Sequence, residues 1–180
     1  MVTYIALIRG INVTGNKIVP MAKLREMFEA LGFKQVRTYI ASGNVIFQAA
    51  KTAPEKLSRK IEAEILKEFG FSASVITKTP EELAAALSNN PFLKEKNIDP
   101  SKLHVSFLSD VGAEAGISKL AALETGCDRF HCVGREIYLH CPDGYGNTKL
   151  NNNVLEKLLG VTATTRNWNT VSKLYAMAVE

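Results

Sequence analysis

The stretch "VTYIALIRGINVTGNK", residues 2–17, joins an apolar run directly to a polar loop. Residues 2–8 are apolar at nearly every position, which is typical of a central strand covered on both faces. The loop contains two cations, two glycines and two asparagines, namely Arg9, Lys17, Gly10, Gly15, Asn12 and Asn16. A helix is predicted to open at Val19-Pro20, so the stretch begins a strand–loop–helix unit.

The first half of the chain predicts four strands and three helices. Strands are expected at residues 2–8, 36–40, 45–47 and 72–77, and helices at 20–31, 54–69 and 80–87. The first two helices are indicated by apolar residues at spacings of three and four, and the third by its start signals. Thr79 and Glu82 are placed to form a capping box around Pro80.

The second half predicts the same order of elements. Strands are expected at residues 103–108, 130–133, 137–141 and 161–165, and helices at 113–124, 150–160 and 168–179. The predicted fold is therefore α+β, a tandem repeat of two ferredoxin-like units, each β-α-β-β-α-β plus an extra helix. The expected units are 1–88 and 103–180, with 89–102 as a linker. A single α/β domain with a mixed sheet is the alternative.

Composition predicts a cytoplasmic protein with a core of its own. The 180 residues are 46% hydrophobic, enough to bury a core without disulfides or metals. No apolar run approaches the roughly 18 residues of a membrane span, and the start does not read as a secretory signal. Cys127, Cys132 and Cys141 form no CxxC pair, so we expect reduced thiols and no membrane partner.

The net charge of +4 is unevenly distributed. Residues 1–90 hold 12 Lys and Arg against 8 Asp and Glu, whereas residues 91–180 hold 10 of each. This surplus favours anionic partners for the first half, although most of these charges fit a solvated surface. It falls short of the basic stripe of a dedicated nucleic-acid binder.

The predicted topology brings two polar segments of the first half together. In a ferredoxin-like unit, the loop after strand one and the turn between strands two and three lie at the same end of the sheet. A first cluster would therefore combine "RGINVTGNK" (9–17) with "ASGN" (41–44): Arg9, Gly10, Asn12, Asn16, Lys17, Ser42, Gly43 and Asn44. Exposed amides, a helix N-terminus and cations suit an anion. Neither a P-loop nor a dinucleotide motif is present, and these residues also suit simple turns.

The second half predicts a second cluster. The segments "CPDGYGNTK" (141–149) and "TTRNWN" (164–169) are expected to leave the same edge of the sheet. This would gather Gly144, Tyr145, Gly146, Lys149, Arg166, Asn167 and Trp168, a set that could hold a planar or phosphorylated ligand. The alternative is structural, with Asn167 as an N-cap and Trp168 as an anchor for the last helix.

Histidines and cysteines at 131–141 do not predict a metal site. Alternation along the hairpin places Phe130, Cys132, Ile137, Leu139 and Cys141 on one face, and His131, Tyr138 and His140 on the other. Because the potential ligands fall on opposite faces, we expect no metal, and no motif indicates a cofactor. Asp143 is the only acid in either cluster, so whether a reaction is catalysed stays open.

Three stretches carry a resemblance to a bacterial family: "YIALIRGINVTG", "VRTYIASGNVIF" and "TTRNWNTVSKL". Together they resemble the uncharacterised family called domain of unknown function 1697, over nearly the whole chain. The resemblance implies a cytoplasmic α+β protein and supplies no activity, substrate, cofactor or catalytic residue. It draws attention to the RGIN, SGN and RNWNTV segments, whose signature positions could equally be structural.

These observations favour a cytoplasmic protein that binds a small anionic ligand, a class that includes phosphorylated compounds, through Gly, Asn and Arg loops. The alternative is a nucleic-acid or protein interaction module that uses the sheet surface. For nucleic acid, only Tyr4, Tyr39 and Phe47 could stack bases, so that partner is less favoured. The sequence leaves the oligomeric state open.

Overall fold

The computed structural model describes all 180 residues, which form two compact units. The first consists of Met1–Ala84 together with Leu174–Glu180, and the second of Ala85–Lys173. The structure thus places the segment expected to be a linker in the second unit, and the chain's last seven residues with the first. No helix is long and apolar enough to cross a membrane.

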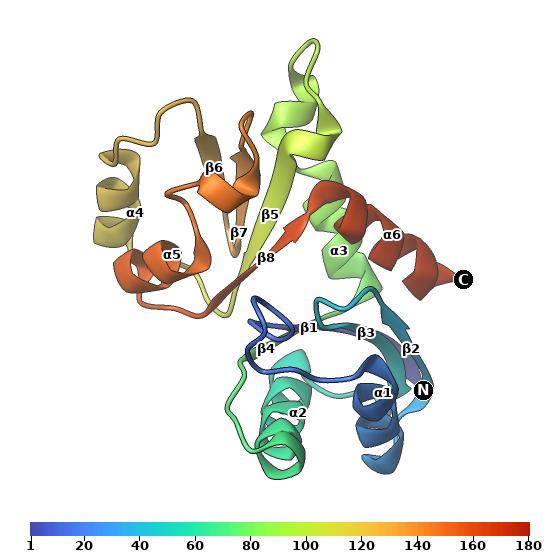
Figure 1. Ribbon diagram of the computed structural model, residues 1–180. Coiled ribbons are helices and arrows are strands. Elements are labelled where there is room, and N and C mark those ends of the chain that lie inside the picture. The colour runs from blue at the N-terminus through green and yellow to red at the C-terminus, as the bar shows by residue number, and fades with distance from the viewer. The chain divides into compact units, whose positions relative to one another are not determined.

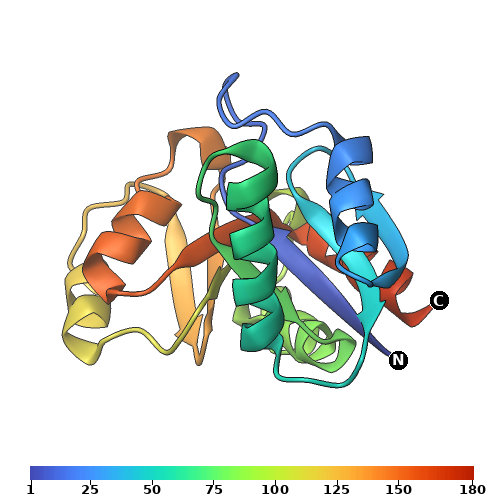
Figure 2. The same ribbon diagram turned by 90° about the horizontal axis from the view of Figure 1, so that it is seen from below.

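The first unit contains one four-stranded antiparallel sheet in the order β2-β3-β1-β4. Its strands are β1 (Val2–Ile8), β2 (Lys34–Tyr39), β3 (Asn44–Ala49) and β4 (Val75–Lys78). Helices α1 (Met21–Ala30) and α2 (Pro54–Phe69) lie on one face of this sheet (Figure 1). Figure 2 shows both helices in front of the sheet, as seen from below.

The second unit contains a sheet with the corresponding order, β6-β7-β5-β8, which is also antiparallel. Its strands are β5 (Leu103–Leu108), β6 (Arg129–Val133), β7 (Glu136–His140) and β8 (Ala163–Asn167). Its helices are α4 (Glu114–Ala121) and α5 (Asn152–Leu159), and short 3-10 turns occur at Pro91–Lys94, Pro100–Lys102 and Tyr145–Asn147. Helices α3 (Pro80–Ser88) and α6 (Trp168–Val179) each cross a unit boundary.

The fold is thus mixed α/β, with two four-stranded antiparallel sheets and six helices. The alternative of a single mixed sheet is wrong. The predicted capping box is confirmed at α3, where the Thr79 amide donates to Glu82 Oε2 over 2.8 Å and the Glu82 amide donates to Thr79 Oγ1 over 3.2 Å. The predicted last strand, 161–165, is shifted by two residues, because β8 runs from Ala163 to Asn167.

Each unit has an apolar core between its sheet and its helices. In the first unit, Phe28, Phe33 and Phe47 form an aromatic cluster with ring centroids 4.5 to 5.8 Å apart. In the second, Leu139 and Cys141 of the predicted inward face pack in the core. The predicted alternation of the hairpin is therefore confirmed.

Candidate functional site

The loop between β1 and α1 is held in place by the side chain of Asn12. Its Nδ2 donates to the carbonyl oxygens of Val19 (2.9 Å) and Ala41 (2.8 Å), and its Oδ1 accepts from the Val19 amide (2.7 Å). Asn12 has a φ of 54°, a left-handed conformation that asparagine adopts more readily than most residues. These bonds tie the loop to the turn between β2 and β3, so the predicted convergence of the two segments is confirmed.

That turn approaches β1 closely at Gly43. The Ile8 amide donates to the Gly43 carbonyl oxygen over 2.8 Å. Gly43 has a φ of 86°, and a Cβ there would lie 2.9 Å from the Cβ of Ile8 and 3.1 Å from Cδ1 of Ile11. The position therefore needs glycine for space and for backbone conformation.

Two of the three asparagines of the first cluster, Asn12 and Asn44, hold the loops together, whereas Asn16 is exposed. Asn44 is fully buried, and its Nδ2 donates to the Tyr39 carbonyl oxygen and to Ser42 Oγ. Because its side chain has no exposed surface, Asn44 cannot contact a ligand. Among the other predicted residues, Gly10 is exposed and Ser42 is half-buried. Arg9 and Lys17 remain as the charged members of the cluster.

Arg9 and Lys17 line a hollow of about 480 Å³ beside α2, which we name the cationic hollow. Its lining comes from the β1–α1 loop, from α2 and from the segment before β4: Arg9, Lys17, Arg59, Glu62, Ala63, Leu66, Ser72, Ala73 and Ser74. The charged members are three cations and one carboxylate. Sequence analysis did not single out Arg59 or Glu62, because both lie on a regular amphipathic helix and belong to no motif.

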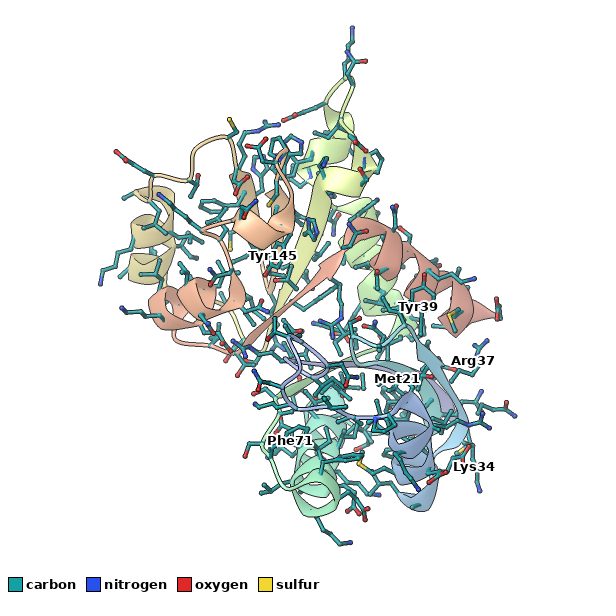
Figure 3. The ribbon with its side chains drawn as sticks, in the orientation of Figure 1. Met21, Lys34, Arg37, Tyr39, Phe71 and Tyr145 are labelled. Atoms are coloured by element: carbon teal, nitrogen blue, oxygen red, sulfur yellow. The ribbon has the colours of Figure 1, made fainter.

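Two of the cations are fixed by contacts with the segment before β4. The Arg9 amide donates to the Ser74 carbonyl oxygen over 2.9 Å. Lys17 Nζ donates to the Ser72 carbonyl oxygen over 2.9 Å and lies 5.7 Å from the ring centroid of Phe71, which is labelled in Figure 3. The backbone of Arg9 and the ammonium group of Lys17 are therefore held beside this segment.

The two charged residues of α2 differ in their contacts. Glu62 Oε1 accepts a hydrogen bond from the Val75 amide over 2.8 Å, which ties α2 to the first residue of β4. Arg59 is exposed on α2, and its side chain has no ion pair or hydrogen bond within the protein. The carboxylate is therefore engaged by the backbone, whereas the Arg59 guanidinium is available to a ligand.

The second unit makes the same contacts at the corresponding place. The Ser109 amide donates to the Thr162 carbonyl oxygen over 2.9 Å, as the Arg9 amide does to Ser74. Glu156 Oε2 accepts from the Ala163 amide over 3.1 Å, which ties α5 to the first residue of β8. The hydrogen bond between the strand ends and the hydrogen bond from the helix glutamate therefore form without the three cations.

The cations have no counterparts in the second unit. Ser109 stands where the first unit has Arg9, and Asn153 stands three residues before the tying glutamate, where the first unit has Arg59. The loop after β5 runs only over residues 109–113 and contains no lysine, whereas the loop after β1 runs over residues 9–20. The three cations are thus an addition to a shared framework.

The second predicted cluster is partly buried. Arg166 and Asn167 belong to β8 rather than to a loop. Arg166 is 7% exposed, its Nη1 donates to Thr164 Oγ1 over 2.8 Å, and burial lowers its pKa to about 10, an effect that Tyr145 partly offsets. Trp168 is also buried, so neither Arg166 nor Trp168 offers a broad surface to a ligand.

The remaining members of the second cluster make different kinds of contact. Asn167 Oδ1 accepts from the Asn169 amide over 2.9 Å at the start of α6, as the N-cap alternative predicts. Tyr145 stacks on His104 with ring centroids 4.9 Å apart, and burial lowers the pKa of His104. Lys149 is exposed and its ammonium group has no partner. Tyr145 and Asn167 are half-buried and Lys149 is exposed, so these three side chains, and not Arg166 or Trp168, offer accessible surface.

The histidines of the hairpin contact an aromatic ring. The ring centroids of His131 and His140 lie 4.7 Å and 5.7 Å from that of Phe92. Arg129 covers the same ring at 5.0 Å and is paired with Glu95 through two hydrogen bonds of 2.8 Å. No group of three or more His, Cys, Asp or Glu side chains in the structure is placed to hold a metal ion.

Comparison with known proteins identifies the family. Residues 1–138 match the family described as protein of unknown function DUF1697, and the chain belongs to this family. A solved structure, described as the conserved bacterial protein SP0830 from Streptococcus pneumoniae, is similar to this chain with a TM-score of 0.78 and 26% identity. The similarity covers 100% of this chain and 99% of that one. No curated protein matches the sequence.

Proposed function

We propose that the protein binds a small anion of the phosphomonoester class in the cationic hollow. The observation that carries this proposal is the convergence of Arg9, Lys17 and Arg59 at a joint where the second unit has Ser109 and Asn153 in place of the two arginines and no lysine in its shorter loop. Clustered like charges repel one another. The second unit folds without these three cations, so the first unit does not need them for folding. Such a cluster is favourable when an anion lies among its members.

The chemistry of the hollow matches a phosphate group. The exposed Arg59 guanidinium can present paired donors to phosphate oxygens, and Arg9 and Lys17 add positive charge. The hydroxyl groups of Ser72 and Ser74 have no hydrogen-bond partner in the protein and are further donors. A ligand with both phosphate and hydroxyl groups would satisfy these serines as well as the cations.

The bonds of Asn12 support the proposal because they order the loop before a ligand arrives. A loop that is already ordered avoids the entropy cost of being immobilised on binding. Lys17 lies in this loop, five residues after Asn12, and its own bond to Ser72 fixes its ammonium group at the hollow. The site is therefore preorganised for an anion.

We also infer that each unit is ferredoxin-like and that the protein is a cytoplasmic bacterial protein. The corresponding strand orders of the two sheets and the matching ties at Glu62 and Glu156 support a tandem repeat. The free thiols of Cys127, Cys132 and Cys141 fit a reducing compartment. The bacterial source of the similar solved structure supports the origin.

The alternative of a nucleic-acid module gains little from the sheet of the first unit. Tyr4 and Phe47, two of the three aromatic residues that could stack bases, are buried in the core. A nucleic-acid complex would also weaken steeply with added salt, because it releases many counterions. Titration with a short oligonucleotide at two salt concentrations separates this alternative from binding of a small anion.

The test is calorimetric titration with inorganic phosphate and with a sugar phosphate. We expect saturable binding that Arg59→Ala weakens by about tenfold, since a charge-assisted contact contributes roughly 1.5–3 kcal/mol before solvent screening. Arg25→Ala is the matched control, because Arg25 is an exposed arginine of α1 that pairs with Glu29 outside the hollow. Equal affinities for the wild type and Arg59→Ala would overturn the proposal.

A further inference from the structure

The first unit has a second hollow, of about 350 Å³, that shares no residue with the cationic hollow. We name it the apolar hollow. It lies where the end of α1, the end of β3 and the start of α2 meet, and its lining is Leu31, Gly32, Phe33, Ala49, Ala50, Thr52, Lys56, Leu57 and Lys60. Its volume is in the range of small-molecule sites.

The apolar hollow has a rigid hydrocarbon floor. Phe33 is 5% exposed and packs against Phe47 with ring centroids 4.5 Å apart. Leu57 and Ala49 are buried beside the same core. An apolar ligand group placed here would replace water over a preformed surface, which is the usual source of affinity in small-molecule sites.

The rim carries two cations and no acid. Lys56 and Lys60 are four residues apart on α2, so they lie on the same face of the helix, where like charges repel. Lys60 Nζ donates to the Leu31 carbonyl oxygen over 3.2 Å and lies 5.2 Å from the ring centroid of Phe33. The ammonium group of Lys56 is exposed and has no partner in the protein.

A structural role accounts for only part of this arrangement. Lys60 supplies a donor to the carbonyl end of α1, whose last turn contains no basic residue. That bond uses one of its three donors. Lys56 makes no such contact. No interaction within the protein therefore accounts for a second lysine beside Lys60.

We infer that the apolar hollow is a binding site for a small amphipathic carboxylate, with its hydrocarbon part on Phe33 and Leu57 and its carboxylate between Lys56 and Lys60. An apolar body matches the floor, and one anionic group relieves the repulsion at the rim. The two hollows thus differ in ligand class. The cationic hollow suits a compact and strongly charged group, whereas the apolar hollow suits a ligand that is mostly hydrocarbon.

The test is a titration of the full-length protein with 3-phenylpropionate, followed by NMR chemical shifts and by calorimetry. We expect saturable binding with shifts centred on Phe33, and weak or no binding of the neutral 3-phenylpropanamide. Lys56→Ala should weaken the carboxylate about fivefold to tenfold and leave the fold intact, because the Lys56 ammonium group contacts nothing. Lys67→Ala, on the same helix outside the hollow, is the control and should bind normally.

Three results would overturn this inference: equal binding of the amide and the carboxylate, unchanged affinity in Lys56→Ala, or no shift near Phe33 at 10 mM ligand, roughly the weak limit of useful affinity. The outcome is independent of the phosphate proposal. Arg59→Ala should retain 3-phenylpropionate binding, and Lys56→Ala should retain phosphate binding, because the hollows share no residue.

Discussion

The two units share a framework and differ at the joint between the first strand, the last strand and the second helix, where only the first unit gathers Arg9, Lys17 and Arg59. In the first unit, Arg59 has no partner in the protein and lies with two other cations around one hollow. In the second unit, Ser109 and Asn153 stand at the positions of Arg9 and Arg59, and Arg129, at a different place on β6, is paired with Glu95 through two 2.8 Å hydrogen bonds. Both units form a complete sheet and a hydrogen bond from a helix glutamate to the last strand. Folding of the first unit therefore does not require its three cations. The difference indicates that those cations serve binding.

The helices differ in a second way. In the second unit, α4 approaches the backbone of α5 at Gly116, where a Cβ would lie 2.0 Å from the Leu158 carbonyl oxygen. Helix α1 of the first unit contains no glycine, and the apolar hollow lies between its end and the start of α2. The close approach joins the start of α4 to the end of α5, whereas the apolar hollow lies at the end of α1 and the start of α2. The two units therefore pack their helices differently, at opposite ends of the helix pair.

The largest effect is expected at Gly116. Gly116→Ala should destabilise the second unit by about 3 kcal/mol or more, because the backbone atoms of α5 must move away from the added methyl group. Urea unfolding monitored by circular dichroism measures this change. Gly146→Ala is the control, because a Cβ there meets no atom within 4 Å, and its stability should be unchanged. A neutral Gly116→Ala would contradict the close packing.

The next effect is expected at Asn12. Asn12→Ala removes three hydrogen bonds and leaves alanine in a left-handed conformation, so we expect a loss of about 2–3 kcal/mol and weaker phosphate binding. Thermal unfolding and phosphate calorimetry measure the two consequences. Asn16→Ala, at the exposed tip of the same loop, should change neither. Normal phosphate binding by Asn12→Ala would show that loop order is unnecessary for the site.

The smallest effect concerns the neutralised pair of the second unit. Hydrogen bonding to Arg129 lowers the pKa of Glu95 below its ordinary value. Because the folded-state pKa is lowered, the contribution of the pair is present above about pH 4.5 and is lost as pH falls through the folded pKa. NMR titration of Glu95 should return its pKa toward the ordinary value in Arg129→Met. An identical pKa in both proteins would contradict the pairing.

Most of the fold could be predicted from the sequence because its elements are marked locally. Apolar periodicity located the strands and most helices, and Thr79 with Glu82 gave the start of α3 correctly. The segment that became the end of β8 is polar, so Arg166 and Asn167 were assigned to a loop. A strand end made of Thr, Arg and Asn has no apolar alternation, so the sequence pattern could not predict it.

The candidate site could be predicted only in part. Arg9 and Lys17 were found because glycines and asparagines surround them in an unusual loop. Arg59 was not found, because one arginine on the solvent side of a helix carries no signal until the fold places α2 beside that loop. The role of Asn44 was also hidden, since a buried and an exposed asparagine look alike in a turn sequence.

The most direct test of the central claim is to locate a bound anion. Crystals of the protein soaked in tungstate, a tetrahedral dianion that scatters strongly, would give an anomalous peak at any built phosphate site. We predict a peak bounded by Arg9, Lys17 and Arg59, and its loss in Arg59→Ala crystals. A peak elsewhere, or an empty cationic hollow at saturating tungstate, would contradict the assignment of this hollow as the anion site.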